Sequence, residues 1–231
     1  MTIVVFHGSP RKGNTRLATE IFMDALQACG GVHFIEFQLP GALPGFCTGC
    51  TLCLGGKGEK CPHAQYTGPI VDALIEADAL VFAIPHYGAC SMPGAMKNLL
   101  DHLAFLELNV APRAEMFRKK AFVLTTGAGS AAAAKPIKTF LKHWGVNRVY
   151  SLSFRMFTDK WGKMPKKKRA RCERSLCRAA RKFYEAPVGR PYLSSAVHYH
   201  MTKFILKKYV GPGNYPYEDW KEKRYFEKRP F

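Results

Sequence analysis

The first twenty residues constrain the fold of this chain more than any other stretch. The apolar run at residues 3–6 leads into a loop of small and polar residues and then into a helical pattern of apolar side chains. This order predicts a buried strand, a tight loop and a helix, whose first backbone N–H groups and positive dipole end attract an anion. Within seven residues the loop also supplies the neutral donors Ser9, Asn14 and Thr15 and the charge of Arg11. An ordinary polar turn is the simpler alternative, but the density of donors favours a phosphate site.

The same loop comes close to the nucleotide-binding pattern G-x-x-x-x-G-K-[ST]. Gly8, Gly13 and Thr15 occupy three of its fixed positions, but Asn14 stands where the pattern has its lysine. That lysine reaches the terminal phosphates of a nucleoside triphosphate. Its absence therefore argues against triphosphate chemistry.

Strand and helix patterns alternate along residues 1–155. Near-continuous apolar runs, which are typical of strands buried on both faces, occur at residues 3–6, 32–37, 79–84 and 121–124, and more weakly at 149–154. Helical patterns occur at residues 18–29, 69–77, 94–106 and 132–144. This alternation predicts right-handed crossovers and a doubly wound, five-stranded parallel sheet of the α/β class, in which ligands bind at the carboxyl ends of the strands.

The loops after the third and fourth predicted strands also contain residues that suit a binding site. The first contains Pro85, His86, Tyr87, Gly88 and Ala89, and the second contains Thr126, Gly127 and Gly129. Proline and glycine fix or free backbone angles, tyrosine offers a flat face, and small residues let main-chain N–H groups reach a ligand. Taken alone, either loop has the residues of an ordinary turn without a ligand. Three such loops on one sheet edge predict a pocket for a flat phosphorylated ring.

Taken in order, these motifs resemble those of the flavodoxin-like NAD(P)H-dependent FMN reductases over residues 1–155. The resemblance involves residues 8–11 with 13–15, residues 85–88 with Met96, Lys97 and Asp101, and residues 126–127. It implies an FMN whose phosphate lies on Ser9, Arg11, Asn14 and Thr15 around Gly13. The ring would lie between the loops at residues 85–89 and 126–129. The resemblance also implies NAD(P)H as a transiently docked reductant, and a homodimer.

Four of the eight cysteines fall within fifteen residues, as Cys47-x-x-Cys50-x-x-Cys53 followed by Cys61-Pro62. Four thiolates at this spacing can converge on one metal centre. The pattern resembles the cysteine motif of the iron–sulfur flavoproteins, which implies a [4Fe-4S] cluster that exchanges single electrons with the flavin. Zinc, and thiols that are free or disulfide-bonded, remain as alternatives. Because the segment follows the second predicted strand, we expect it at the same sheet edge as the flavin.

The net charge of +18 is concentrated in residues 151–231, which hold 21 Lys and Arg against 7 Asp and Glu. We therefore divide the chain into an FMN-binding domain over residues 1–155 and a basic, helical extension over residues 156–231. A stripe at Cys172, Leu176, Ala179 and Phe183 predicts a helix with one buried face, and Cys177 is also expected in the core. A second helical pattern spans residues 195–209. The aromatic residues beyond it are expected to pack on the body or on a partner subunit.

The cations of the tail allow two interpretations. They resemble a nucleic-acid patch, but a solvated helix face is the commoner cause of such a run, and no nucleic-acid-binding motif accompanies it. The sequence also contains no signal peptide and no apolar span long enough for a bilayer, so we expect a cytoplasmic protein.

Together these features predict an FMN-dependent oxidoreductase that takes hydride from NAD(P)H. Its electron acceptor is not identified by the sequence, and a quinone, a flavin, another small molecule or a redox protein would all suit the predicted pocket. An iron–sulfur flavoprotein electron carrier is the first alternative. The second alternative, of another class, is a flavodoxin-like binding module whose tail binds polyanions.

Overall fold

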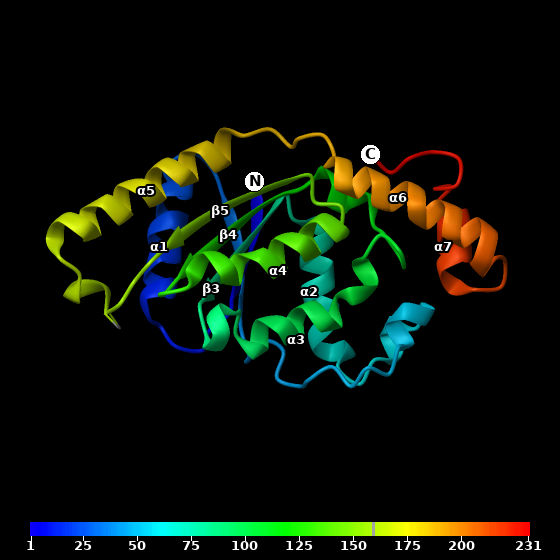
Figure 1. The fold of residues 1–231 in the computed structure, drawn as a ribbon, viewed down its shortest axis with the longest axis horizontal. Helices are drawn as coiled ribbons and strands as arrows, with labels where there is room; N and C mark the ends of the chain where they lie inside the picture. Colours follow the sequence, from blue (N-terminus) through cyan, green and yellow to red (C-terminus); the bar gives the residue numbers. More distant parts are fainter. Residues whose placement is uncertain (159) are drawn as a thin grey trace.

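The computed structural model describes residues 1–158 and 160–231. Its centre is one sheet of five parallel strands in the order β2-β1-β3-β4-β5 (Figure 1). The strands are β1 (Thr2–His7), β2 (His33–Gln38), β3 (Ala79–Pro85), β4 (Lys120–Thr126) and β5 (Arg148–Phe154). Each coincides with a predicted apolar run to within two residues, and this strand order is that of flavodoxin-like sheets. The predicted α/β class is confirmed.

Helices cover both faces of the sheet (Figure 1). One face carries α1 (Asn14–Gln27) and α5 (Lys166–Glu185), and the other carries α2 (Ala64–Glu76), α3 (Gly94–His102) and α4 (Ser130–His143). The predicted start of α2 at residue 69 is five residues too late. Proline favours the first turn of a helix, but Pro69 lies inside α2, where it removes one backbone hydrogen bond. α3 is shorter than predicted, because residues Ala104–Leu106 form a separate 3₁₀ turn.

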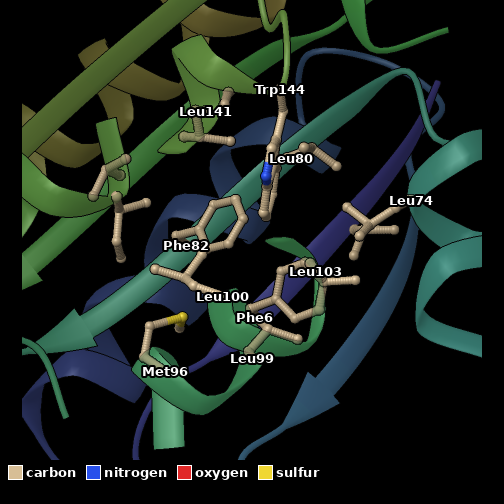
Figure 2. Close-up of a cluster of buried hydrophobic side chains, with 14 of the residues drawn as sticks. Phe6, Leu74, Leu80, Phe82, Met96, Leu99, Leu100, Leu103, Leu141 and Trp144 are labelled. Carbon is tan, nitrogen blue, oxygen red and sulfur yellow. The ribbon is translucent and has the colours of Figure 1, made fainter. Parts of the chain in front are cut away.

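Strand side chains alternate between two cores. Val4 and Phe6 point to the face covered by α2, α3 and α4, whereas Ile3 and Val5 point to the face covered by α1 and α5. Figure 2 shows the first core, where the rings of Phe6 and Phe82 lie 5.1 Å apart between their centroids. Because both faces of the central strands β1, β3 and β4 are buried, these strands need apolar residues at nearly every position, which explains their continuous apolar runs in the sequence.

α5 completes the second core. Its buried residues are Cys172, Leu176, Ala180 and Phe183, and the Phe183 ring meets Phe122 of β4 edge-on with centroids 5.5 Å apart. The predicted stripe is correct except that Ala180, rather than Ala179, is buried. The prediction that Cys177 lies in the core is wrong, because Cys177 is exposed. It follows Leu176 directly, and one residue turns the helix by about 100°, away from the core.

Lys120, the first residue of β4, connects the C-terminal end of α5 to the sheet through hydrogen bonds. Its ammonium group donates hydrogen bonds to the carbonyl oxygens of Phe183 at 2.6 Å, Tyr184 at 2.9 Å and Ala186 at 2.8 Å. These carbonyls belong to the last turn and the cap of α5, where a helix offers no N–H partner of its own. A buried lysine therefore satisfies the C-terminus of this helix.

The C-terminal segment forms a small aromatic core of its own. It consists of α6 (Leu193–Ile205), a π-helical turn (Leu206–Val210) and α7 (Tyr215–Glu222). Tyr199 stacks on Trp220 with centroids 5.1 Å apart, and Ser195 Oγ donates to the carbonyl of Lys142 at 3.1 Å. Phe231 also contacts Phe117 of the body at a centroid distance of 5.0 Å, whereas packing of this segment on a partner subunit stays a prediction. In the described part of the chain, no helix has both the length and the apolarity needed to cross a membrane.

We expect Lys120→Met to destabilise the protein by about 1–3 kcal/mol, because it leaves carbonyl groups of α5 buried without donors. Thermal or urea unfolding monitored by circular dichroism would measure the change. Lys167→Met is the matched control, since Lys167 is exposed on the same helix and such substitutions change stability by about 0.5 kcal/mol or less. Equal stability of the two variants would contradict the capping role of Lys120.

Candidate functional site

The loops at the carboxyl ends of the strands surround a hollow of about 490 Å³. It lies at the junction of β1 and β3, where the strand order reverses. Ligands bind at this place in doubly wound sheets. The lining comes from four segments, which follow β1, β3, β4 and β5.

One part of the hollow is positively charged. α1 begins at Asn14, and the first N–H groups of a helix have no partner within it. Arg11 and Lys12 of the loop before α1, and Lys160 of the segment after β5, also line the hollow. Among the described residues that line it, none carries a carboxylate. This combination of cations and a helix N-terminus favours an anionic ligand.

Hydrogen bonds between side chains join the segments around the hollow. The hydroxyl oxygens of Thr15 and Thr126 lie 2.6 Å apart, which links the start of α1 to the end of β4. Asn14 Nδ2 donates to the carbonyl of Thr158 at 2.7 Å, which links α1 to the segment after β5. Asn14 Oδ1 is buried without a hydrogen-bond partner among the described residues. A buried acceptor of this kind needs a donor, and a ligand in the hollow would supply one.

The loop after β3 has an unusual backbone. The His86 N–H donates to the carbonyl of Thr126 at 2.8 Å, and the Tyr87 N–H donates to the carbonyl of Ser91 at 2.8 Å. Between these bonds, Ala89 and Cys90 have φ angles of 53° and 55°, in the left-handed region. Such strain persists only where the surroundings enforce it, and it is frequent at functional sites.

The loop after β4 needs glycine where it meets the loop after β3. Gly127 has a φ of +124°, and a Cβ there would lie 2.7 Å from His86 Nδ1. At Gly129 a Cβ would overlap the Cys90 side chain. The two loops therefore pack backbone against side chain, and the approach of their main-chain N–H groups to a ligand stays a prediction.

The structure brings most of the predicted cofactor residues together. The hollow is lined by Ser9, Arg11, Gly13, Asn14, Thr15, Pro85, His86, Tyr87, Thr126 and Gly127. Gly88, Ala89 and Gly129 do not line it. Their contact with a cofactor stays a prediction, as does that of the residues lining the hollow.

Sequence reasoning missed four lining residues, which are Lys12, Met156, Thr158 and Lys160. Three of them follow β5. The rule that ligands bind at the carboxyl ends of strands applies to β5 as well, so the end of the last apolar run was a usable signal. Because the apolar pattern of the sheet ends there, the sequence places residues 156–160 in the basic extension instead.

The four clustered cysteines line a second hollow, of about 390 Å³. Its wall also includes residues of α2 and the two rings of His63 and His102, whose nitrogens Nδ1 and Nε2 lie 3.0 Å apart. This hollow shares no lining residue with the first. The cysteine hollow is therefore separate from the first, and it extends along α2 to the C-terminal end of α3. That the cysteines lie at the same sheet edge as the flavin stays a prediction.

The cysteines gather without forming a metal-binding geometry. In the described residues, no three His, Cys, Asp or Glu side chains stand close enough together to hold a metal ion. Burial, followed by the neighbouring thiol groups of Cys47 and Cys61, raises the pKa of the Cys53 thiol. Asn98 of α3 fixes the start of the loop, accepting the Cys47 N–H at 2.9 Å and donating to the carbonyl of Gly45 at 2.8 Å.

Comparison with known proteins gives a family match. The family model described as NADPH-dependent FMN reductase matches residues 1–156, which is more than half of the chain. Among curated proteins, none matches this sequence significantly.

Several solved structures share the fold. An NADH:FMN oxidoreductase in its apo form is 22% identical, with a TM-score of 0.58 over 85% of this chain and 98% of that one. The NAD(P)H:quinone oxidoreductase from Methanothermobacter marburgensis is 18% identical, with a TM-score of 0.61 over 80% and 96%. An FMN-dependent NADH-azoreductase from Bacillus anthracis, in complex with FMN, is 9% identical, with a TM-score of 0.61 over 80% and 99%. At these identities the likeness is one of fold.

We expect Gly127→Ala to destabilise the protein by about 1–3 kcal/mol, because the new Cβ forces a strained backbone conformation and presses on His86. Urea unfolding would measure the loss. Gly94→Ala is the matched control, since a Cβ at Gly94 meets nothing within 4 Å and its φ is ordinary for an L residue. If both variants unfold at the same urea concentration, the two loops do not require glycine at their contact.

Proposed function

Because the chain belongs to the NADPH-dependent FMN reductase family, we propose that the hollow between β1 and β3 binds FMN and that the protein transfers electrons from NAD(P)H to a small-molecule acceptor. The observation that carries this proposal is the convergence of a helix N-terminus, three cations and three small-residue loops on one hollow. An oxidoreductase of this kind needs no protein nucleophile, because the reactive group belongs to the cofactor.

The residues present fit FMN in size and in charge. The volume of about 490 Å³ lies within the range of about 300–1,000 Å³ that is usual for small-molecule sites. Arg11, Lys12 and Lys160 match a phosphate, and the buried Asn14 Oδ1 offers an acceptor to a hydroxyl or N–H group of the ligand. The anion site and the ring-binding loops line the same hollow, as a phosphorylated flat ring requires.

When bound, FMN would supply the chemistry of hydride and electron transfer. Arg11 and the first N–H groups of α1 would hold its phosphate through charge-assisted hydrogen bonds. The main chain at His86 and Gly127, fixed by the bond from the His86 N–H to Thr126, would position the ring. Tyr87 is 38% exposed and lines the hollow, so it would contact the cofactor on one side and an incoming molecule on the other.

The reductant and the acceptor would use the same open side of the ring in turn. The sequence contains no second dinucleotide fingerprint, so NAD(P)H would dock transiently, drawn by the positive charge around the hollow. A quinone is the acceptor class we favour, because a flat apolar molecule can stack on a flavin beside Tyr87. The fold neighbours named for quinone and azo-dye reduction agree with this choice.

The cysteine hollow supports a second candidate function, that of an iron–sulfur electron carrier. Four thiols line one space, which is the donor set that a [4Fe-4S] cluster takes. Their present spacing is wider than coordination allows, so the loop would have to tighten on binding. We therefore propose the cluster as the alternative that metal analysis of this loop tests.

We expect the purified protein to carry FMN, to lose its yellow colour on anaerobic addition of NADPH, and to bind FMN more tightly than riboflavin. Arg11→Gln should raise the Kd for FMN about tenfold or more, because one charge-assisted bond to phosphate contributes about 1.5–3 kcal/mol. The Kd for riboflavin, which has no phosphate, should not change. Flavin fluorescence quenching measures both constants.

Lys57→Gln serves as the control, because Lys57 is an exposed lysine outside the hollow. An equal loss of affinity for FMN and riboflavin would mean that Arg11 does not contact the phosphate. A colourless protein that binds neither flavin, but is retained on polyanions in a salt-dependent way, would favour the binding-module alternative.

Iron and acid-labile sulfide in stoichiometric amounts after anaerobic purification would establish the cluster, and zinc would establish the zinc alternative. Cys53→Ser should then release the metal. Cys177→Ser, an exposed thiol on α5, should retain it and is the matched control. Flavin without any metal would leave the four cysteines as thiols or disulfides.

A further inference from the structure

α6 presents an uncovered row of apolar side chains to solvent. One side of the helix packs on the body through Ser195, Tyr199 and Thr202, all of which are buried. The opposite side and its margins expose Leu193, Val197, Met201, Phe204, Ile205 and Tyr209. Leu193 is 81% exposed and Tyr209 is 68% exposed. We call this set the α6 ridge, and its spacing of three or four residues keeps it on one side of the helix.

The stretch of chain that carries the α6 ridge has charge of a single sign. The stretch of residues 186–217 contains no Asp or Glu, and its charged residues are Arg190, Lys203, Lys207 and Lys208. Lys208 Nζ lies 5.3 Å from the ring centroid of Phe204 and 5.2 Å from that of Tyr209. Lys208 therefore stands among the exposed apolar groups, and Lys207 Nζ lies 5.5 Å from the ring centroid of Phe226. A surface that pairs with this helix must accept apolar side chains and offer negative charge at the same place.

We propose that the α6 ridge docks on the surface of an anionic lipid bilayer. Helices that lie in the plane of a membrane surface bury aromatic and aliphatic side chains about 5–10 Å deep and direct Lys and Arg to the headgroups. α6 lies at the edge of the molecule, where the C-terminal segment passes beside it (Figure 1), and the side chains of the α6 ridge are exposed. A convex ridge of this kind needs no complementary groove, because lipids adapt to it. The proposal does not depend on the flavin chemistry.

A second copy of the chain fits the α6 ridge less well. Two ridges packed together would bury apolar side chains, but neither partner would bring a carboxylate from this stretch to pair with Lys207 or Lys208. Those ammonium groups would lose water without gaining an ion pair, which is unfavourable. Lipid phosphates and serine carboxylates supply the missing negative charge.

The test is co-sedimentation of the full chain with vesicles of phosphatidylcholine mixed with phosphatidylserine, and with vesicles of phosphatidylcholine alone. We expect binding to the mixed vesicles, weakening as salt rises, and much less binding to phosphatidylcholine. The triple variant Val197→Ser, Met201→Ser, Phe204→Ser should abolish binding. Phe46→Ser, which changes a phenylalanine that is 74% exposed elsewhere, should leave it intact. Because all four side chains are exposed, the unfolding temperature should stay constant.

A second pair of variants separates docking by α6 from general attraction of a basic protein. Lys207→Gln with Lys208→Gln should weaken the partition about thirtyfold, at about 1 kcal/mol per cation near the surface. Arg174→Gln with Arg178→Gln removes two exposed cations from α5 and should have a much smaller effect. Absence of binding to the mixed vesicles, or equal effects of the two pairs, would overturn the proposal. So would a dimer in light scattering that the triple variant converts to a monomer, because the ridge would then be an interface between copies.

Discussion

When a parallel sheet is covered on both faces, the polar groups that could bind a ligand lie at the ends of its strands. In β1, Ile3, Val4, Val5 and Phe6 are completely buried, so no polar group in the middle of the strand could reach a ligand. The chain can become polar only where a strand ends and the crossover begins. Because all strands run in the same direction, the loops that begin the crossovers share one edge. The hollow at that edge is a consequence of how the sheet buries its side chains.

Local interactions then turn a set of loops into one site. Each segment that lines the hollow is bonded to another: α1 to β4 through Thr15 and Thr126, and α1 to the segment after β5 through Asn14 and Thr158. The left-handed Ala89 and Cys90 are held by packing against the glycine loop after β4. This packing keeps the loop after β3 in a strained backbone conformation that it would otherwise leave. A backbone that is already fixed before a ligand arrives is preorganised for binding.

How much the sequence predicts depends on whether a contact is local. The strands follow from consecutive residues, and their positions are confirmed to within two residues. The loop before α1 follows from consecutive residues as well, and its binding of an anion stays a prediction. The predicted start of α2 is too late because proline favours the first turn of a helix, whereas Pro69 lies in the second turn of α2. The cysteines show the other limit. Their spacing predicts a donor set, but the path of the loop depends on Asn98, 51 residues from Cys47 in the sequence, and no local pattern contains that bond.

The net charge of the chain does not by itself indicate a binding partner, because its cations have different contacts and roles. α5 contains nine Lys and Arg, yet it is a core helix whose apolar face packs against α1 and β4. Its cations occupy the outer faces that remain, and Glu173 is within 3.9 Å of Arg169, so part of that charge is paired locally. Lys120 is also cationic, and it satisfies backbone carbonyls in the interior. The cations beside the α6 ridge differ, because their stretch contains no carboxylate and they lie among exposed apolar side chains. The position of a cation and the groups around it, rather than the net charge of +18, distinguish a cation that recognises a partner from one that keeps a helix face hydrated.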